Sequence, residues 1–155
     1  MKHLSLYAVL ALVIDQASKL WILKGLSLET VGRIEVWPPF LVFQMAWNQG
    51  INFGLFGGDG AATRWLLIGV ALAICFWVGL WVRRGMNSAG QIFAGLLIGG
   101  ALGNVLDRVI YGAVVDFLNM SCCGFANPFS FNTADVFVFI GVFGLVLFGK
   151  DENAT

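Results

Sequence analysis

Apolar residues are concentrated in four stretches of the chain, and the first three are each about as long as a membrane crossing. The stretches cover residues 4–24, 62–82, 89–109 and 134–148. A helix of about 20 apolar residues spans the hydrocarbon core of a bilayer. The fourth stretch is short, and it suffices only if it begins close to one interface. The pattern predicts a membrane all-α bundle of four transmembrane helices.

The first stretch also has the outline of a secretory signal peptide, because Lys2 and His3 precede its apolar run. No small-residue cleavage pattern follows that run. Instead the helix pattern continues through Asp15–Lys19 into residues 20–23. We therefore interpret residues 4–24 as a retained membrane helix.

The segment between the first two helices, residues 25–61, has a different pattern. Its β-branched and aromatic residues favour short strands that are interrupted by Pro38-Pro39. Those residues are Val31, Ile34, Val36, Phe40, Val42 and Phe43. Glycines between residues 54 and 60 indicate turns before the second helix. We expect a small β-rich platform lying on the membrane, with Trp37, Trp47 and Trp65 as interfacial anchors.

Composition supports a lipid environment and narrows the functional classes. Hydrophobic residues make up 59% of the 155 positions, charged residues 12%, and the mean hydropathy is +0.84. A soluble domain of this length would leave much of that apolar surface in water. We expect one integral membrane domain over residues 1–155. The net charge of +0 provides no field that would attract nucleic acid.

The distribution of basic residues predicts an orientation. Lys2, Arg83-Arg84 and Lys150 fall on one side of the predicted bundle, and basic residues mark the cytoplasmic side. Both termini are then cytoplasmic. Residues 25–61 and 110–133 form the outer segments.

Cysteine and histidine patterns point away from a metal site. The chain has three cysteines without zinc-site spacing, and His3 is its one histidine. We expect neither a metal nor another cofactor. Cys122 and Cys123 are adjacent, and the sequence is compatible with a reduced pair, a vicinal disulfide or a lipid-facing pair.

Acidic residues in or beside membrane helices need a partner or a function, because an ionised carboxylate in hydrocarbon is costly. Asp15 and Lys19 stand four residues apart, the spacing of an ion pair on one helix face. Such a pair either forms a structural polar seam or assists a site directly.

Asp107 and Arg108 come near the outer end of the third helix. Asp107 is expected to be solvated at the interface or locally paired. Arg108 follows Asn104 by one turn, and its forked donors suit a peptide carbonyl or a carboxylate. Support of the fold and substrate binding remain equal alternatives for Arg108.

Asp116 and Asp135 are candidates for a catalytic pair. Asp116 follows a turn and strand after the third helix, and Asp135 opens the fourth, so both should lie at the outer level. Of two neighbouring carboxylates, one keeps a proton and acts as acid while the other acts as base. The alternative is a helix N-cap for Asp135 and a solvated turn residue for Asp116.

Four ordered blocks resemble the lipoprotein signal peptidases, which are also called type II signal peptidases. They are Asp15–Lys19 (DQASK), Asn48–Phe53 (NQGINF), Gly103–Arg108 (GNVLDR) with Val114–Phe117 (VVDF), and Phe131–Asp135 (FNTAD). The blocks cover nearly the whole chain. One departure is visible: Asn52 stands where the family usually has a small apolar residue, so substrate contacts in that loop should differ.

The resemblance implies an aspartic endopeptidase of the bacterial inner membrane that acts without a cofactor. Its substrate would be a diacylglyceryl-modified prolipoprotein, cut just before the modified cysteine. The family's catalytic pair falls on Asp116 and Asp135. Asn48, Asn104, Arg108 and Asn132 would line the substrate pocket, with Asp15 and Lys19 in support. The active site would face the periplasm, and a monomer among membrane lipids would suffice.

Two other functional classes compete with this interpretation. A small four-helix transporter would need an essential carboxylate near the midplane of the membrane, where Asp15 is the candidate. The long outer segment 25–61 is more than a minimal transporter requires. A non-enzymatic membrane scaffold would tolerate the loss of Asp116 or Asp135.

Overall fold

The structure is a computed structural model, and it describes residues 1–50, 60–122 and 127–150. Most of the chain is helical, and three short strands lie between the helices. The elements are α1 (Lys2–Leu20), the π-helical turn η1 (Trp21–Gly25), α2 (Leu28–Val31), β1 (Arg33–Trp37), β2 (Leu41–Asn48), α3 (Gly60–Arg83), α4 (Ser88–Tyr111), β3 (Val114–Asn119) and α5 (Thr133–Phe148). The expected Asn52 contacts and the turns over residues 54–59 lie outside the described residues.

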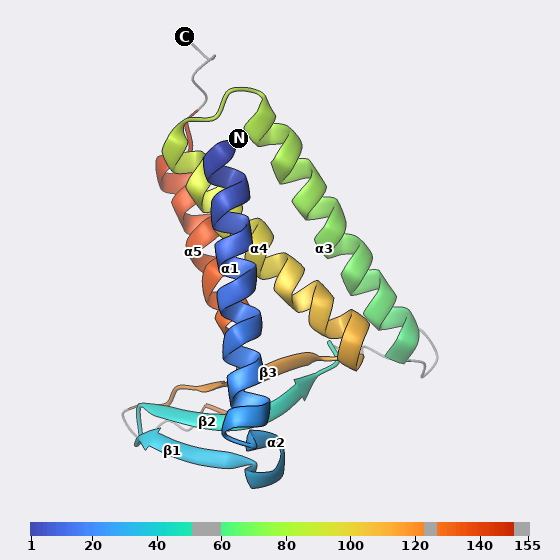
Figure 1. Cartoon of the computed structure of the whole chain (residues 1–155), viewed down its shortest axis with the longest axis vertical. Helices are drawn as coiled ribbons and strands as arrows, with labels where there is room; N and C mark the ends of the chain where they lie inside the picture. Colours follow the sequence, from blue (N-terminus) through green and yellow to red (C-terminus); the bar gives the residue numbers. More distant parts are fainter. Residues whose placement is uncertain (51–59, 123–126, 151–155) are drawn as a thin grey trace.

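Four helices form a bundle, with the sheet at one end (Figure 1). Three segments are long and apolar enough to cross a membrane, namely Lys2–Gly25, Ala61–Arg83 and Ser88–Tyr111. The fourth helix, α5, has 16 residues and is apolar but shorter. The predicted membrane helical bundle with a small sheet is therefore confirmed.

Helices α1 and α4 run in parallel, and glycines on α4 allow their close approach. A Cβ added at Gly95 would meet the backbone of Leu4, and one added at Gly99 would meet the backbone of Ala8. The contact that lies four residues further along α4 also lies four residues further along α1, so the two helices run in the same direction. Small residues at four-residue spacing are the usual means of bringing membrane helices close.

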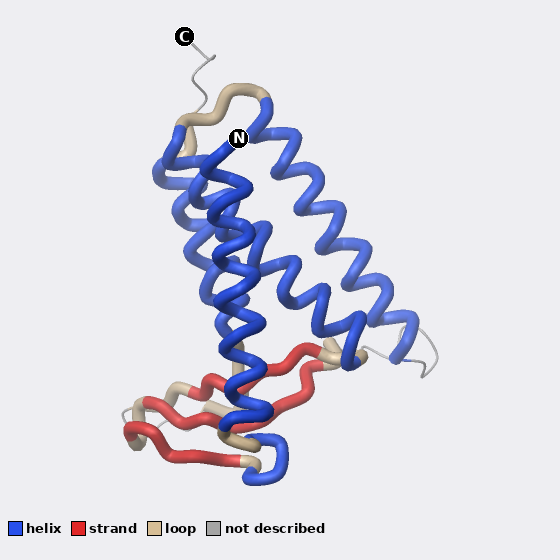
Figure 2. The backbone as a smooth tube through the Cα atoms, viewed as in Figure 1, coloured by secondary structure: helices blue, strands red, loops and turns tan. Residues whose placement is uncertain are grey.

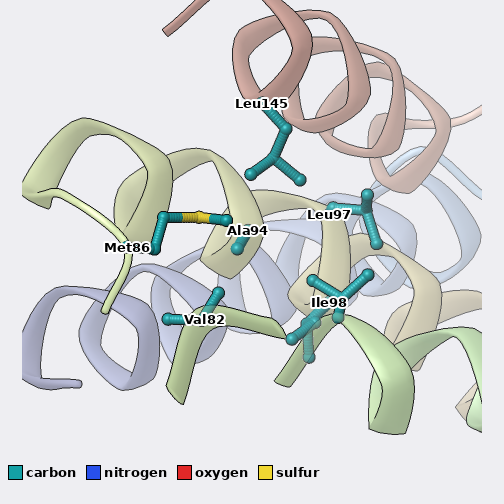
Figure 3. Packing of buried hydrophobic residues seen from close by; sticks show 7 residues of the cluster. Val82, Met86, Ala94, Leu97, Ile98 and Leu145 are labelled. Carbon is teal, nitrogen blue, oxygen red and sulfur yellow. The ribbon is translucent and has the colours of Figure 1, made fainter. Parts of the chain in front are cut away.

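Helix α5 packs antiparallel against α4 through a second set of glycines. A Cβ at Gly100 would meet Ala134 at the start of α5, and Gly141 of α5 lies against Leu97. Apolar residues of α3, α4 and α5 close the bundle at the end away from the sheet (Figure 3). The buried cluster there comprises Val78, Val82, Met86, Ala94, Leu97, Ile98 and Leu145.

The sheet has three antiparallel strands in the order β1-β2-β3 (Figure 2). The first two come from the segment after α1, as predicted, but the third follows α4. Pro38-Pro39 separates β1 from β2, as the sequence indicated. The prediction of strand structure was wrong at Val31, which ends the short helix α2, and at Phe40, which lies in the turn between β1 and β2.

A second apolar cluster joins the sheet to the end of the bundle. Val115 and Phe117 of β3 pack with Ile22 of η1 and Leu28 of α2. Since successive residues of a strand point to opposite faces, Asp116 between them faces away from this cluster. The cluster thereby fixes where β3 lies. Elsewhere, Cys122 is disulfide-bonded and Cys75 is a free thiol, while Cys123 lies outside the described residues.

Candidate active site

Asp116 lies in the middle of β3 and is 2% exposed. The expectation of a solvated turn residue was therefore wrong. Each of its carboxylate oxygens accepts a hydrogen bond from an asparagine amide. Asn132 donates to Oδ1 at 2.6 Å, and Asn48, at the end of the adjacent strand β2, donates to Oδ2 at 3.0 Å.

Asp135 is the third residue of α5, and the cap of this helix is Asn132. The alternative that made Asp135 the N-cap was therefore wrong. The two residues form a reciprocal capping box. Asn132 Oδ1 accepts from the backbone N–H of Asp135 at 3.1 Å, and the backbone N–H of Asn132 donates to Asp135 Oδ2 at 3.1 Å. The helix start holds the Asp135 carboxylate in one orientation.

Asn132 connects the two aspartates. Its amide oxygen takes the backbone N–H of Asp135, so its amide nitrogen must face the other way, where it donates to Asp116. Asn132 is buried. A single side chain thus sets the relative positions of a carboxylate from the sheet and a carboxylate from α5.

The pKa of Asp116 is raised to about 6. Burial is the main cause, because it penalises the charged form, and the nearby Asp135 raises the pKa further. The hydrogen bonds from Asn132 and Asn48 and the charge of Lys19 act in the opposite direction. A carboxyl group with this pKa can hold and release a proton near neutral pH.

Asn104 of α4 connects the aspartates to a buried cation. Its amide nitrogen donates to Asp135 Oδ1 at 2.8 Å. Its amide oxygen accepts from Lys19 Nζ at 3.2 Å and from Asn132 Nδ2 at 3.1 Å. An ammonium group can only donate, so Lys19 keeps the oxygen of Asn104 toward itself and the N–H toward Asp135.

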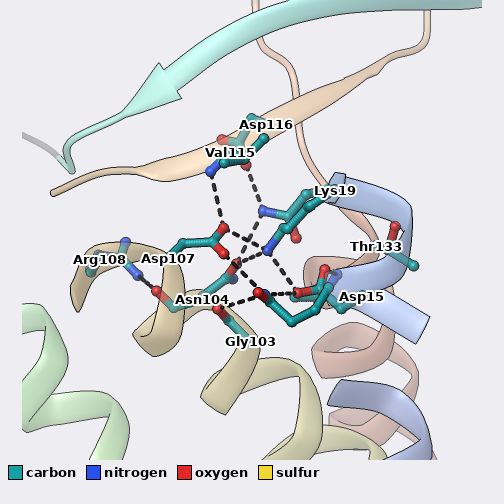
Figure 4. Close-up of polar contacts among 12 residues, drawn as sticks. Asp15, Lys19, Gly103, Asn104, Asp107, Arg108, Val115, Asp116 and Thr133 are labelled. Atoms are coloured by element: carbon teal, nitrogen blue, oxygen red, sulfur yellow. Dashed lines mark hydrogen bonds and ion pairs between the residues drawn. The ribbon is translucent and has the colours of Figure 1, made fainter. Parts of the chain in front are cut away.

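Lys19 forms ion pairs with two carboxylates inside the bundle (Figure 4). The predicted pair with Asp15 is confirmed at 2.8 Å. The second pair, also at 2.8 Å, is with Asp107, which is completely buried. The expectation that Asp107 is solvated or locally paired was therefore wrong.

Backbone groups complete this cluster and tie it to both aspartate-bearing elements. The N–H of Val115, next to Asp116, donates to Asp107 Oδ2 at 3.1 Å. The N–H of Ala134, next to Asp135, donates to Asp15 Oδ1 at 2.8 Å. Two aspartates share one lysine, so one negative charge has no cation of its own. The hydrogen bonds from these backbone N–H groups help to stabilise that charge.

Two members of the cluster, Asp107 and Gln16, were not among the predicted site residues. The Gln16 amide donates to Asp107 Oδ1 at 3.0 Å and to Asp15 Oδ2 at 3.1 Å. A sequence signal for Asp107 existed. It continues the four-residue spacing of Gly99 and Gly103, and that glycine face of α4 packs on α1.

Arg108 lies beside the aspartates, one turn after Asn104. Its Nη1 donates to the backbone oxygen of Asn104 at 3.3 Å. The guanidinium is close enough to interact electrostatically with Asp116 and Asp135. All eight predicted site residues thus converge on one region between the sheet and the bundle. In the described part of the chain, no group of three or more His, Cys, Asp or Glu side chains could hold a metal ion.

Comparison with known proteins gives one consistent result. Residues 7–149 match the family model described as Signal peptidase (SPase) II. The chain is 43% identical over 146 residues to a lipoprotein signal peptidase of Methylorubrum extorquens, covering 92% of this chain and 82% of the relative. It is 40% identical over 149 residues to the lipoprotein signal peptidase of Caulobacter vibrioides, covering 94% and 86%.

Solved structures share the fold. A bacterial membrane enzyme determined by the in meso method at 1.9 Å resolution matches with a TM-score of 0.79 and 29% identity, over 95% of this chain and 92% of that one. A second bacterial membrane enzyme, determined by the same method at 2.3 Å, matches with a TM-score of 0.74 and 28% identity, over 95% and 87%.

Proposed function

Because the chain belongs to the signal peptidase II family and is a lipoprotein signal peptidase, we propose that Asp116 and Asp135 are its catalytic carboxylates. The observation that carries this proposal is the shared contact with Asn132, which holds a sheet carboxylate and a helix carboxylate in one polar site. Both are members of the blocks that carry the family resemblance.

Peptide hydrolysis by this pair needs one proton between two carboxylates. The ionised carboxylate takes a proton from a water molecule, which attacks the scissile carbonyl carbon. The protonated carboxyl group stabilises the developing oxyanion, and a proton then passes to the leaving amine. The raised pKa of Asp116 supports a pair in which one member is protonated below about pH 6.

Asn48, Asn104, Arg108 and Asn132 line the polar site, and we assign them to substrate binding and to orienting the aspartates. Arg108 offers forked donors beside the pair, which suit a peptide carbonyl. Asp15 and Lys19 support the site from inside the bundle through Asn104 and the start of α5. These roles explain why so many polar groups are buried in an apolar chain.

The substrate we propose is a prolipoprotein with a diacylglyceryl-modified cysteine, cut just before that cysteine. Such a substrate keeps its acyl chains in hydrocarbon while its peptide reaches the interface. Strand β3, which carries Asp116, and the start of α5, which carries Asp135, lie where the helices meet the sheet, at one end of the bundle (Figure 1). This depth suits a peptide bond that lies beside a lipid anchor.

We place the chain in the bacterial inner membrane with both termini in the cytoplasm and the sheet at the periplasmic face. Lys2, Arg83, Arg84 and Lys150 support this orientation, because all lie at helix ends away from the sheet. Each catalytic and supporting group comes from one chain, so a monomer suffices, surrounded by membrane lipids.

The test is cleavage of a synthetic diacylglyceryl-modified prolipoprotein peptide by purified Asp116→Asn and Asp135→Asn variants. Both should lose activity by at least about a thousandfold, since neither amide can transfer the proton. Glu35→Gln is the matched control, because it removes an exposed carboxylate from strand β1 of the same sheet. Cleavage by either aspartate variant at the control's rate would refute the assignment.

A further inference from the structure

A hollow of about 210 Å³ lies on the outside of α3, at the end away from the sheet. Its lining consists of Trp77, Leu80, Trp81 and Arg84. These positions are three, four and seven residues apart, so they follow one face of the helix and its last turn. The two indole rings are 6.3 Å apart at an angle of 30°. Together they form a shaped apolar wall that ends in a guanidinium group.

This face is not covered by the described part of the chain. Helix α3 packs against α4 through another face, which contains the buried residues Val78 and Val82. Trp77 remains 68% exposed, and Trp81 40%. Because α3 is a candidate membrane span, the surrounding medium at these indoles is lipid. Tryptophan is typical of the boundary between hydrocarbon and headgroups.

The chemistry at the helix end favours a negatively charged headgroup. Arg83 and Arg84 are adjacent and exposed, and guanidinium groups bind phosphate oxygens through paired donors. The carbonyl groups that a helix end would expose are partly satisfied here. Trp81 O accepts from the N–H of Arg84, and Val82 O accepts from those of Gly85 and Met86. Because these carbonyl oxygens already accept hydrogen bonds, the end of α3 repels an anion less than a helix end with unpaired carbonyl groups would.

Other basic groups lie at the same end of the bundle. The backbone N–H of Lys150 contacts the Asn87 side chain, which caps α4, and Lys2 begins α1. The acidic residues nearest in sequence, Asp151 and Glu152, lie outside the described residues. Among described residues, basic side chains prevail at this end, and such a surface attracts anionic lipid.

We propose that the hollow formed by Trp77, Leu80, Trp81 and Arg84 is a binding site for one anionic phospholipid. The two indoles and Leu80 contact its acyl chains, and Arg84 with Arg83 binds its phosphate group. The site is far along the bundle from Asp116 and Asp135. It therefore does not depend on the catalytic proposal.

Native mass spectrometry of the full-length protein, purified and delipidated in neutral detergent, tests the site. The protein is titrated with phosphatidylglycerol or with phosphatidylcholine. The unmodified protein should bind its first phosphatidylglycerol at a concentration about fivefold lower than phosphatidylcholine, and Arg84→Gln should abolish that preference. The Trp77→Ala, Trp81→Ala double variant should weaken binding of both lipids.

Two control variants and a phosphate titration separate this site from general attraction to lipid. Arg33→Gln removes an exposed arginine from the sheet, and Trp65→Ala removes an exposed tryptophan from the other end of α3. Both should keep the preference for phosphatidylglycerol. Inorganic phosphate should not displace the lipid, because it lacks acyl chains. Equal binding of the two lipids, an equal effect of Arg33→Gln, or displacement by phosphate would overturn the proposal.

Discussion

The ammonium group of Lys19 in α1 lies 2.8 Å from the carboxylate of Asp107 in α4. The same carboxylate accepts from the N–H of Val115, the residue before Asp116. A cation from the first membrane helix therefore helps to hold the strand that presents the proposed catalytic aspartate. Breaking a buried ion pair by removing one partner leaves an uncompensated charge, which is strongly destabilising.

Replacement of Lys19 by methionine should lower the free energy of unfolding by about 3–5 kcal/mol, because Asp15 and Asp107 would lose their shared cation. Thermal unfolding in detergent measures the change. Lys24→Met is the matched control, since Lys24 is an exposed lysine in η1. An equal loss of stability in the two variants would show that the buried ion pairs contribute nothing specific.

The pH dependence of cleavage should reflect the titration of Asp116. Its pKa of about 6 means that the pair loses its shared proton above this pH. We expect kcat/KM to fall by about tenfold per pH unit above pH 6, once a single required proton is lost. Steady-state cleavage of the lipid-modified peptide between pH 5 and 8 measures this limb. A flat profile across that range would contradict the assignment.

The same titration affects stability, with a sign that follows from the raised pKa. Between the ordinary Asp value of 3.8 and about 6, the folded protein binds a proton that the unfolded chain has released. Stability contributed by the neutral form is therefore lost as pH rises through this window. Asp116→Asn does not titrate, so its stability relative to the unmodified protein should increase from pH 4 to 6 and then stay constant.

Replacement of Asn48 by alanine should shift the pH above which kcat/KM falls, and it should also lower the rate of cleavage. The Asn48 amide donates to Asp116 Oδ2 and lowers the pKa of that carboxyl group. Without this bond the pKa rises, so the fall of kcat/KM should begin at a higher pH. Gln44→Ala is the control on the same strand. A lower rate with an unmoved limb would assign Asn48 a purely structural role.

Two glycines of the membrane helices should respond oppositely to alanine. A Cβ at Gly99 would meet the Ala8 backbone and lie 2.7 Å from the Ala11 Cβ, whereas one at Gly69 would meet nothing within 4 Å. We expect Gly99→Ala to cost about 1–3 kcal/mol through overpacking. Gly69→Ala should be neutral or slightly stabilising, because alanine favours the helix. Thermal unfolding of both variants distinguishes close packing from loss of a helical glycine.

The local sequence pattern was sufficient to predict the membrane helices and one ion pair. Four apolar stretches and the four-residue spacing of Asp15 and Lys19 are properties of short segments, and the helical period converts them directly into spans and a shared face. The first two strands also followed from local residue types. Ordered motif blocks identified Asp116 and Asp135 as the candidate pair.

Long-range pairing decided the rest. The sequence does not show that β3, which begins at Val114, joins a sheet that begins at Arg33, because strand pairing depends on packing between distant segments. Nor does the sequence show that Lys19 forms an ion pair with Asp107 as well as with Asp15. Chain pattern by itself thus determined which segments enter the membrane. Only the tertiary structure, by burying these polar groups where water cannot satisfy them, decided which partners they have.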